Sequence, residues 1–513
     1  MLAASCLPDS ATIGAEHPTT HYWPTVLAVI GRDGILACMT RQDEVSRLTP
    51  QTDLDPWADG APRSSRPKAF LVVSAVAAVN VYLVLFCGRS SRDNLEQDLL
   101  ASALLWVGSM PLVHYLVRRP KSVPFFPAIC VIYVIYLALP RFSSRALFSA
   151  SNVKPAPDAV TRALLVGLIG VTMLIVACVA ATVLVRRVPR MARAIDLPRA
   201  VPWVALGSAL ILLDPATVGG PALGQLPQML VQTGELSLAA LFLAYLRRHL
   251  SVWITAYLFG LLVARVLIGL GTGALATAGL PLIPPAFIYS WERRRVPWAF
   301  LVVSVLSLVV LDAGKDAFRA KYWGRGDVGN GRLSNGLRYL DVTRETVTRS
   351  DTNDLWHHAA DRTNMLATLA IVTSETPEHV PYWDGYTLRD LPWHLIPRVL
   401  VPDKPVGLLG QDFPRRYGLL DYDDYGTSYN LAHIVELYIN FGFAGVLVGM
   451  AIIGAIYGLL GHILEHTTSG AIIASCLFAS MLNVESNITD TLGGVPMTLL
   501  ASYAYIRLLP QAG

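Results

Sequence analysis

The sequence has little charge. Lys, Arg, Asp and Glu make up 15% of its 513 residues, whereas soluble domains carry about 25%. Hydrophobic residues make up 53%, and the mean hydropathy is +0.47. Long blocks of Leu, Val, Ala and Ile stand where a soluble protein would carry charges. This composition excludes an ordinary soluble domain and predicts a protein that crosses a membrane several times.

Cysteine is also scarce, and the motifs of several enzyme classes are missing. The six cysteines form no Cys-x-x-Cys pair and no Cys/His metal spacing. We therefore expect small buried side chains rather than a disulfide framework or a zinc site. No Walker loop, dinucleotide-binding glycine fingerprint, nucleophile elbow or transporter-like internal repeat occurs. The sequence thus gives no indication of a bound cofactor.

Apolar runs recur along the chain. A helix needs about 20 apolar residues to cross the hydrocarbon core. The expected spans are 69–87, 97–117, 123–139, 160–185, 201–213, 227–246, 252–269, 273–290, 297–312, 436–460, 471–487 and 494–508. They predict an all-α polytopic membrane protein of about twelve transmembrane helices.

The spans divide the chain into four segments. Residues 1–67 are expected to be a disordered cytoplasmic tail, or partly a misassigned start, because they fit neither a span nor a signal peptide. Residues 68–312 form an N-terminal bundle of about nine helices. Residues 313–435 form a large external loop, and residues 436–513 hold the C-terminal transmembrane helices.

Two stretches of the loop have helix-like apolar spacing. They are 356–372 and 388–400, and each is too short or too interrupted to cross a membrane. The second stretch stops at Pro402 and Pro405. We interpret both as helices that lie on, or dip into, the membrane surface.

Basic residues predict the orientation. They gather in the short loops 118–122, 186–193, 247–251 and 291–295, whereas the loop 214–225 has no Lys or Arg. Loops rich in Lys and Arg stay in the cytoplasm. We therefore expect a multi-pass protein of the inner (plasma) membrane with both termini in the cytoplasm and residues 313–435 outside.

Ionisable side chains near the outer ends of spans suggest a site. Arg265 lies inside a span, and Arg319 follows the ninth span. His433, Glu436 and Asn440 are spaced i, i+3 and i+7, which puts them on one helix face. Arg265 could instead snorkel to headgroups, and the polar stripe could be a contact between helices. Asp214, Glu235 and Asp490 are interpreted as ordinary interfacial residues.

The external loop adds arginines and aromatic rings. An arginine fork suits phosphate, and flat rings stack on sugars or form an interfacial belt. The acidic run 419–429 lacks the spacing of a metal site.

The segment 391–450 resembles bacterial O-antigen polymerases (Wzy-like) and related oligosaccharide repeat-unit polymerases. The resemblance rests on the run IPR at 396–398, the turn PDKP at 402–405 and the run ELYINFG at 436–442, followed by Gly445. The order of many spans, a large late loop and a few final spans also fits. The motifs are shared loosely with O-antigen ligases.

The resemblance implies a GT-C-like membrane glycosyltransferase. Its donor would be a glycan on undecaprenyl diphosphate, and its product an O-antigen, capsule or exopolysaccharide made by inverting transfer at the outer membrane face, without metal or cofactor. The implied bases are Glu436 and His433. Arg265, Arg319, Arg362, Arg398 and Lys404 would bind the diphosphate. Trp383, Trp393, Tyr425, Tyr438 and Asn440 would bind the glycan.

The implied partners are the lipid-linked oligosaccharide, the bilayer and a chain-length regulator, with no nucleic acid. Two alternatives stay open. The first is an O-antigen-ligase-like enzyme that transfers the glycan to another acceptor. The second is a lipid-glycan flippase or transporter, which would place charges near the bilayer midplane rather than at one end.

Overall fold

The computed structural model describes residues 65–87, 95–143, 153, 155–156, 158–188, 195–213, 226–322, 331–349, 363–396, 409–424 and 427–511. Every regular element in these ranges is helical, apart from an isolated bridge between Ile195 and Gln511. Eight of the described helices are long and apolar enough to cross a membrane. In the membrane interior a helix satisfies its own backbone groups, which is why such sequences fold this way. The predicted all-α, multi-pass class is confirmed.

The eight long helices match eight of the expected spans. They are α2 (Ser65–Tyr82, extended by a π-helical turn to Cys87), α3 (Leu95–Arg118), α4 (Phe125–Leu137, extended by a 3₁₀ turn to Phe142), α5 (Ala159–Leu184), α7 (Leu226–Leu246), α8 (Val252–Leu270), α11 (Trp298–Tyr322) and α17 (His433–Leu464). The ninth predicted span differs, because α11 runs on past residue 312. Phe318, in this extension, is buried against Tyr339 with ring centroids 5.0 Å apart, and this packing supports the extra turns.

Shorter helices stand at the other four expected spans. They are α6 (Leu197–Ser208, extended by a 3₁₀ turn to Leu212), α9 (Leu275–Gly279) with α10 (Ile283–Arg293), α18 (Thr468–Met481) and α20 (Val495–Leu508). The expected span 273–290 is divided by a 3₁₀ turn, Leu280–Leu282, where prolines interrupt the helix. None of the four reaches the length of about 20 residues that a full crossing needs.

The region between α11 and α17 holds short helices. They are α12 (Arg332–Arg349), α14 (Met365–Glu375), the 3₁₀ turn η11 (Tyr386–Leu388), α15 (Leu391–Leu395) and α16 (Leu409–Arg416). The segment between α18 and α20 adds α19 (Ile488–Gly493).

The structure corrects the expected interfacial helix at 356–372. Its described part belongs to α14, in which nine of the eleven residues, including Met365, Leu369 and Val372, are buried. The helix packs on α5, and the Ala156 amide donates to Ser374 Oγ over 3.1 Å. An interfacial helix would expose one face to lipid, whereas protein covers this one. Of the second expected helix, 388–400, the structure describes α15 and its flanks, and residues 397–400 lie outside the described ranges.

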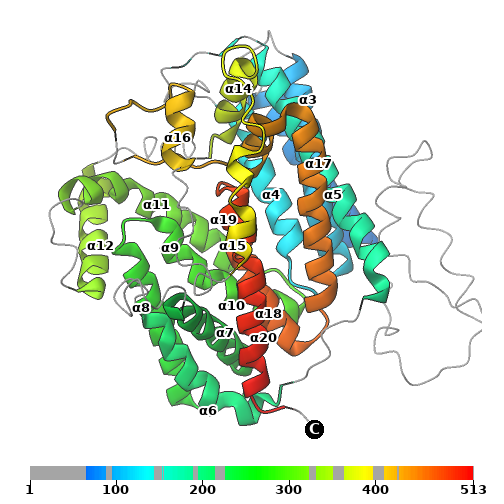
Figure 1. Cartoon of the computed structure of the whole chain (residues 1–513). Helices are drawn as coiled ribbons and strands as arrows, with labels where there is room; N and C mark the ends of the chain where they lie inside the picture. Colours follow the sequence, from blue (N-terminus) through cyan, green and yellow to red (C-terminus); the bar gives the residue numbers. More distant parts are fainter. Residues whose placement is uncertain are drawn as a thin grey trace, which may run out of the picture. The chain divides into compact units, whose positions relative to one another are not determined.

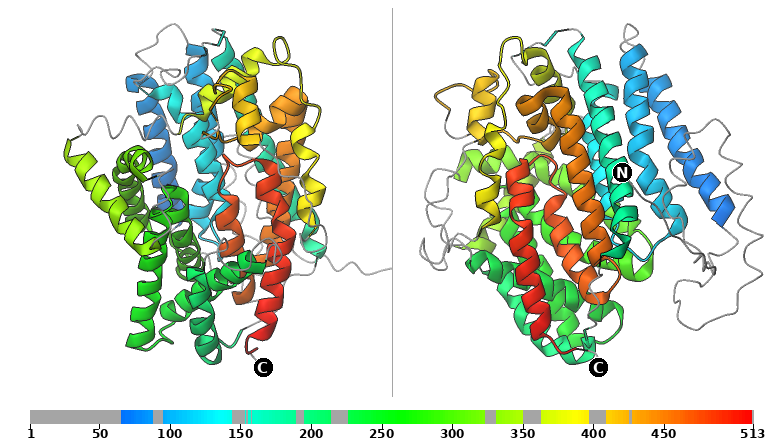
Figure 2. Two further views of the ribbon diagram at one scale, coloured as in Figure 1. Left: turned by 60° about the vertical axis from the view of Figure 1, so that its left-hand side comes forward. Right: turned by 45° about the vertical axis from the view of Figure 1, so that its right-hand side comes forward.

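The helices α5 and α17 run side by side over most of their length (Figures 1 and 2). Two glycines of α17 lie directly against the α5 backbone, Gly454 at the Leu174 carbonyl and Gly458 at the Cys178 carbonyl. A side chain at either position would meet that backbone. The pair is therefore a small-residue helix contact of the kind that holds membrane helices together.

The described parts of the four basic loops lie at one end of the helices. Arg247 makes two hydrogen bonds of 3.0 Å to the Glu292 carboxylate, from Nε and from Nη2. Lys121 lies 4.5 Å from the centre of the Trp291 ring. Burial lowers the pKa of Lys121, and Glu292 and two arginines of these loops are its charged neighbours. Residues 186–188 of the loop 186–193 lie at the same end, because His462 Nε2, near the end of α17, lies 3.3 Å from the Val188 carbonyl oxygen.

We call the end of the bundle that holds these loops the basic end. Pro510, near the C-terminus, lies at the same end, because the Asp196 amide, which follows the loop 186–193, donates to the Pro510 carbonyl. The start of α17 lies at the opposite end with α14 and α16 (Figure 1).

Candidate functional site

Three polar side chains occupy one buried face at the start of α17. His433, Glu436 and Asn440 have exposed fractions of 1%, 0% and 0%. Buried polar groups destabilise a fold unless they find hydrogen-bond partners inside the protein. The partners of these three residues therefore decide what the polar stripe does.

His433 joins three helices. The Tyr133 hydroxyl of α4 lies 3.2 Å from Nδ1, and the Thr491 hydroxyl of α19 lies 3.0 Å from Nε2. A neutral imidazole donates from one nitrogen and accepts at the other, so it satisfies both contacts. Both ring nitrogens are thus engaged within the protein.

Glu436 holds the first turn of α19. The Ile488 amide donates to Glu436 Oε2 over 2.6 Å. The Thr387 hydroxyl lies nearby, yet no described group has hydrogen-bond geometry to Oε1. Among the described residues no Lys or Arg pairs with Glu436, and its charged neighbour is Asp490. A buried carboxyl group is costly without partners, so the hydrogen bond from the Ile488 amide is what offsets the burial of Glu436.

Asn440 ties α17 to the turn η11. Its Nδ2 donates to Thr387 Oγ1 over 2.8 Å and to the Glu436 carbonyl over 2.7 Å. The Thr489 hydroxyl in turn donates to the Thr387 carbonyl over 3.2 Å. Through Thr387, the polar stripe fixes η11 beside α19.

The α17 helix breaks just after this stripe. Gly442 has φ 62° and ψ −148°, a conformation open almost only to glycine. A Cβ atom at Gly442 would lie 2.6 Å from the Tyr382 hydroxyl oxygen. The Trp383 amide donates to the Ile439 carbonyl over 2.9 Å on the other side of the break. The segment before η11 therefore folds directly over the interrupted helix.

Exposed side chains cover this buried network. The Arg389 guanidinium carbon lies 4.1 Å from the centre of the Tyr386 ring, and that of Arg416 lies 4.7 Å from the centre of the Trp383 ring. Asp490 is exposed and accepts a 2.7 Å hydrogen bond from Asn487 Nδ2.

We call Tyr386, Arg389, Arg416 and Asp490 the exposed polar cluster. The Trp383 and Tyr386 rings, whose centroids are 5.7 Å apart, connect its two arginines. Together its members offer two cations, a carboxylate and an aromatic face to a ligand.

The structure describes only some of the residues that the sequence grouped into one site. Arg362, Arg398, Lys404 and Tyr425 lie outside the described residues. Trp383, predicted to bind glycan, is 6% exposed, and Asn440 is buried in the network described above. Trp393 is 45% exposed and Tyr438 is half-buried, with Tyr382 and Arg162 as neighbours.

The two described cations predicted to bind diphosphate lie in other helices. Arg265 of α8 has Glu235 of α7 as its charged neighbour. Arg319 of α11 donates from Nε to the Gly273 carbonyl over 3.1 Å. No hydrogen bond or ion pair among the described residues joins either cation to Glu436.

Asp490 lies in a short helix, α19, that the sequence did not predict. We interpreted it as an ordinary interfacial residue, and α19 was not predicted because six residues carry no helical periodicity. The available signal was the polar run SNITDT at 486–491, which follows an apolar block. Among the described residues, no group of three or more His, Cys, Asp or Glu side chains is arranged to hold a metal ion.

Comparison with known proteins finds one family. Residues 207–484 match it, which is more than half of the chain and includes the polar stripe of α17, while α19 lies beyond the match. No curated protein and no solved structure matches the chain. By this match, the chain belongs to the family described as Domain of unknown function (DUF8712).

Proposed function

We propose that this protein is a membrane glycosyltransferase that polymerises undecaprenyl-diphosphate-linked oligosaccharide units. The observation that carries the proposal is a pair of exposed, ring-stacked arginines, Arg389 and Arg416, at the end of the bundle opposite the basic loops. The hydrogen bond from the Thr489 hydroxyl to the Thr387 carbonyl holds α19, which carries the exposed Asp490, at the same end. A diphosphate leaving group needs cations, a sugar needs an aromatic face, and an acceptor hydroxyl needs a base. The cluster offers all three beside helices that cross the bilayer.

The proposed reaction is one displacement. The acceptor hydroxyl attacks the anomeric carbon of the donor glycan, and its proton passes to Asp490. The bond between that carbon and the diphosphate oxygen breaks, and its electron pair leaves with the polyprenyl diphosphate. Arg389 and Arg416 stabilise the negative charge that develops on the diphosphate. Attack opposite the leaving group inverts the anomeric centre.

Glu436 has a positioning role in this proposal. Its carboxyl is fully buried and holds the amide of Ile488, two residues before Asp490. It therefore acts through α19 rather than on the substrate. His433 and Asn440 support the same segment through Thr491 and Thr387.

The wider arrangement follows from the same proposal. The basic end faces the cytoplasm together with both termini, and the exposed polar cluster faces outward from an inner membrane that the chain crosses about twelve times in a GT-C-like arrangement. Arg362, Arg398 and Lys404, which lie outside the described residues, are still expected to bind the diphosphate. Trp393 and Tyr438, together with Tyr425 outside the described residues, are expected to bind the glycan. A chain-length regulator is the expected protein partner.

A deletion strain tests the proposal. Loss of this gene is expected to leave single repeat units on the final surface acceptor, because every other step continues while chain growth stops. Electrophoresis of the surface glycan measures this as the collapse of a ladder to its first step, and the plasmid-borne gene should restore the ladder.

Two other outcomes would contradict polymerisation. Long chains that accumulate on undecaprenyl diphosphate would identify a ligase. Lipid-linked repeats held on the cytoplasmic side would identify a transporter.

A transporter is the second candidate, and the break in α17 favours it. Interrupted helices beside buried carboxyls line substrate paths in many carriers, and Gly442 lies close to Glu436 along α17. Arg265 and Glu235 are also charged neighbours inside spanning helices.

A further inference from the structure

The accessible surface of α12 is divided into an apolar strip and a polar strip. Leu333, Leu337 and Leu340 are 48%, 54% and 38% exposed and follow the i, i+4, i+7 spacing of one face. The exposed Arg344 ends this apolar strip at i+11, and its long side chain can carry the charge to the membrane surface. The adjoining strip is exposed and polar, and it consists of Ser334, Arg338, Asp341, Glu345 and Arg349. The third side of the helix is buried, with Asn335, Gly336, Tyr339, Val342 and Thr343. A row of exposed leucines is unfavourable in water and indicates contact with an apolar environment.

The neighbouring helix α11 marks where the lipid-facing surface ends. From Phe300 to Val310 its surface is mostly exposed and apolar, and Asp312 is the first charged residue of the helix. The Tyr339 hydroxyl of α12 donates to the Leu311 carbonyl over 2.8 Å. This bond fixes α12 at the border between the apolar and polar parts of α11.

Contacts with α8 agree with that level. Gly336 lies against the backbone of Leu267, and a side chain there would overlap the Leu267 carbonyl. Because α8 starts at Val252 beside the basic end, Leu267 lies about 22 Å along the helix from that end. The contact therefore sets α12 near the opposite face of the membrane.

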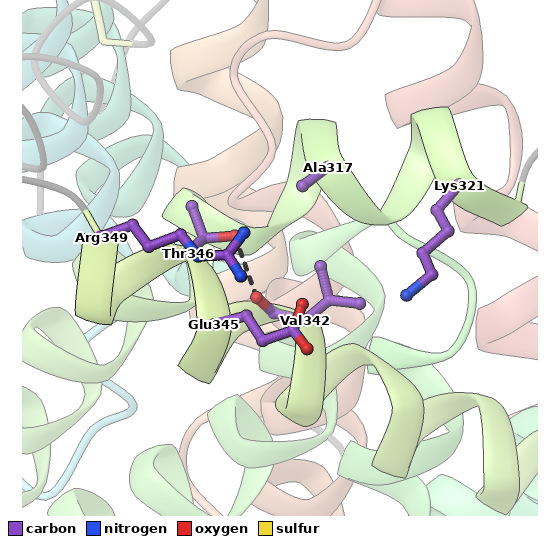
Figure 3. Close-up of a pocket in the computed structure, with 6 residues that line it drawn as sticks. All are labelled: Ala317, Lys321, Val342, Glu345, Thr346 and Arg349. Atoms are coloured by element: carbon purple, nitrogen blue, oxygen red, sulfur yellow. Dashed lines mark hydrogen bonds between the residues drawn. The ribbon is translucent and has the colours of Figure 1, made fainter.

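The polar strip borders a pocket between α11 and α12 that is lined by both charged and apolar side chains. The pocket measures about 250 Å³ and is lined by Ala317, Lys321, Val342, Glu345, Thr346 and Arg349. Figure 3 shows Lys321 and Arg349 on opposite sides of it. Charged side chains of this kind belong in water or among lipid headgroups. The two strips of α12 thus suit two different solvents.

We propose that α12 is an interfacial helix whose leucine strip is inserted into the leaflet opposite the basic end. The occupant of the strip is lipid, because the strip continues the apolar surface of α11 at the level where that surface ends. Arg338 and Arg349 then lie on the water side. The segment directly after α11 is consequently held at the membrane surface, an anchor that the sequence pattern had assigned to 356–372 and 388–400. This inference is independent of the proposed catalytic function.

Spin labels on the full-length protein in lipid nanodiscs test the anchor. Leu337→Cys carries the label on the apolar strip, and Arg338→Cys is the matched control one residue away on the polar strip. Cys6, Cys38 and Cys87 are first replaced by serine, whereas Cys130, Cys178 and Cys476 are buried and remain. Collision with oxygen reports lipid, and collision with a water-soluble nickel chelate reports water.

We expect oxygen to dominate at Leu337→Cys and the nickel chelate to dominate at Arg338→Cys. A third label at Val303→Cys, on the exposed apolar part of α11, supplies the lipid reference. Dominance of the nickel chelate at Leu337→Cys would overturn the proposal, because the strip would then face water. Protection of that label from both reagents would also overturn it, because protein rather than lipid would cover the strip.

Discussion

Asp490→Asn is expected to lower glycosyl transfer by about 10²- to 10⁴-fold, the usual contribution of a general base. The amide keeps the shape of the side chain and an oxygen for Asn487 Nδ2, so α19 should fold as before. What it loses is the ability to take the proton of the acceptor hydroxyl. The measurement is the rate at which polyprenyl diphosphate is released by purified protein supplied with lipid-linked glycan.

Two matched variants make this result specific. Glu485→Gln changes another acid of the same segment, which accepts a 2.8 Å bond from Asn430, and should retain most of the activity. Glu436→Gln should also retain most of the activity, because the amide oxygen can still accept the hydrogen bond from the Ile488 amide. The new NH₂ group takes the place of Oε1, which accepts no hydrogen bond from the described residues. Loss of activity in Glu436→Gln with full activity in Asp490→Asn would assign the base to Glu436 instead.

Gly442→Ala is expected to destabilise the protein by about 3 kcal/mol, which combines a backbone conformation open almost only to glycine with a steric clash. The added Cβ would meet the Tyr382 hydroxyl at 2.6 Å, so either α17 or the segment before η11 must move. For a chain of this size such a loss lowers the melting temperature by about 3 °C. Thermal unfolding in detergent measures the shift.

The matched control lies in the same helix. At Gly461 an added Cβ would have Glu465 Oε1 as its nearest atom, at 3.6 Å, which is ordinary contact. Gly461→Ala should therefore leave stability unchanged or raise it by up to about 1 kcal/mol, since alanine favours helix. Equal melting temperatures for the two variants would show that the break at Gly442 does not constrain the helix.

The helices were predicted correctly from the sequence where length and hydropathy alone determine them. Long apolar blocks such as 159–184 need no tertiary information, because length and hydropathy alone make them spans. Prediction from the sequence failed where tertiary packing determines how far a helix extends or whether it is buried. The polar tail of α11 continues past the predicted end, where Phe318 is buried against Tyr339. Similarly, α14 is too short to cross a membrane and was predicted to lie on its surface, yet α5 and other helices of the bundle bury it.

The candidate site was predicted in part for a similar reason. Spacing alone put His433, Glu436 and Asn440 on one face of a helix. Spacing cannot say what that face meets, and the structure fills it with Tyr133, Thr387 and α19 rather than with an open site. In the exposed polar cluster, the segment 386–389 and the helix that carries Asp490 are joined by one hydrogen bond, from the Thr489 hydroxyl to the Thr387 carbonyl. A contact across about a hundred residues leaves no local pattern in a single sequence.

The most direct test of the proposed polymerase activity is the reaction itself in a defined membrane. Purified full-length protein in liposomes, supplied with one undecaprenyl-diphosphate-linked repeat unit, is analysed by mass spectrometry for glycan length and free polyprenyl diphosphate. The account predicts longer lipid-linked glycans, with one polyprenyl diphosphate released for each new glycosidic bond. Repeat units that cross the bilayer unchanged in length, with no polyprenyl diphosphate released, would contradict it.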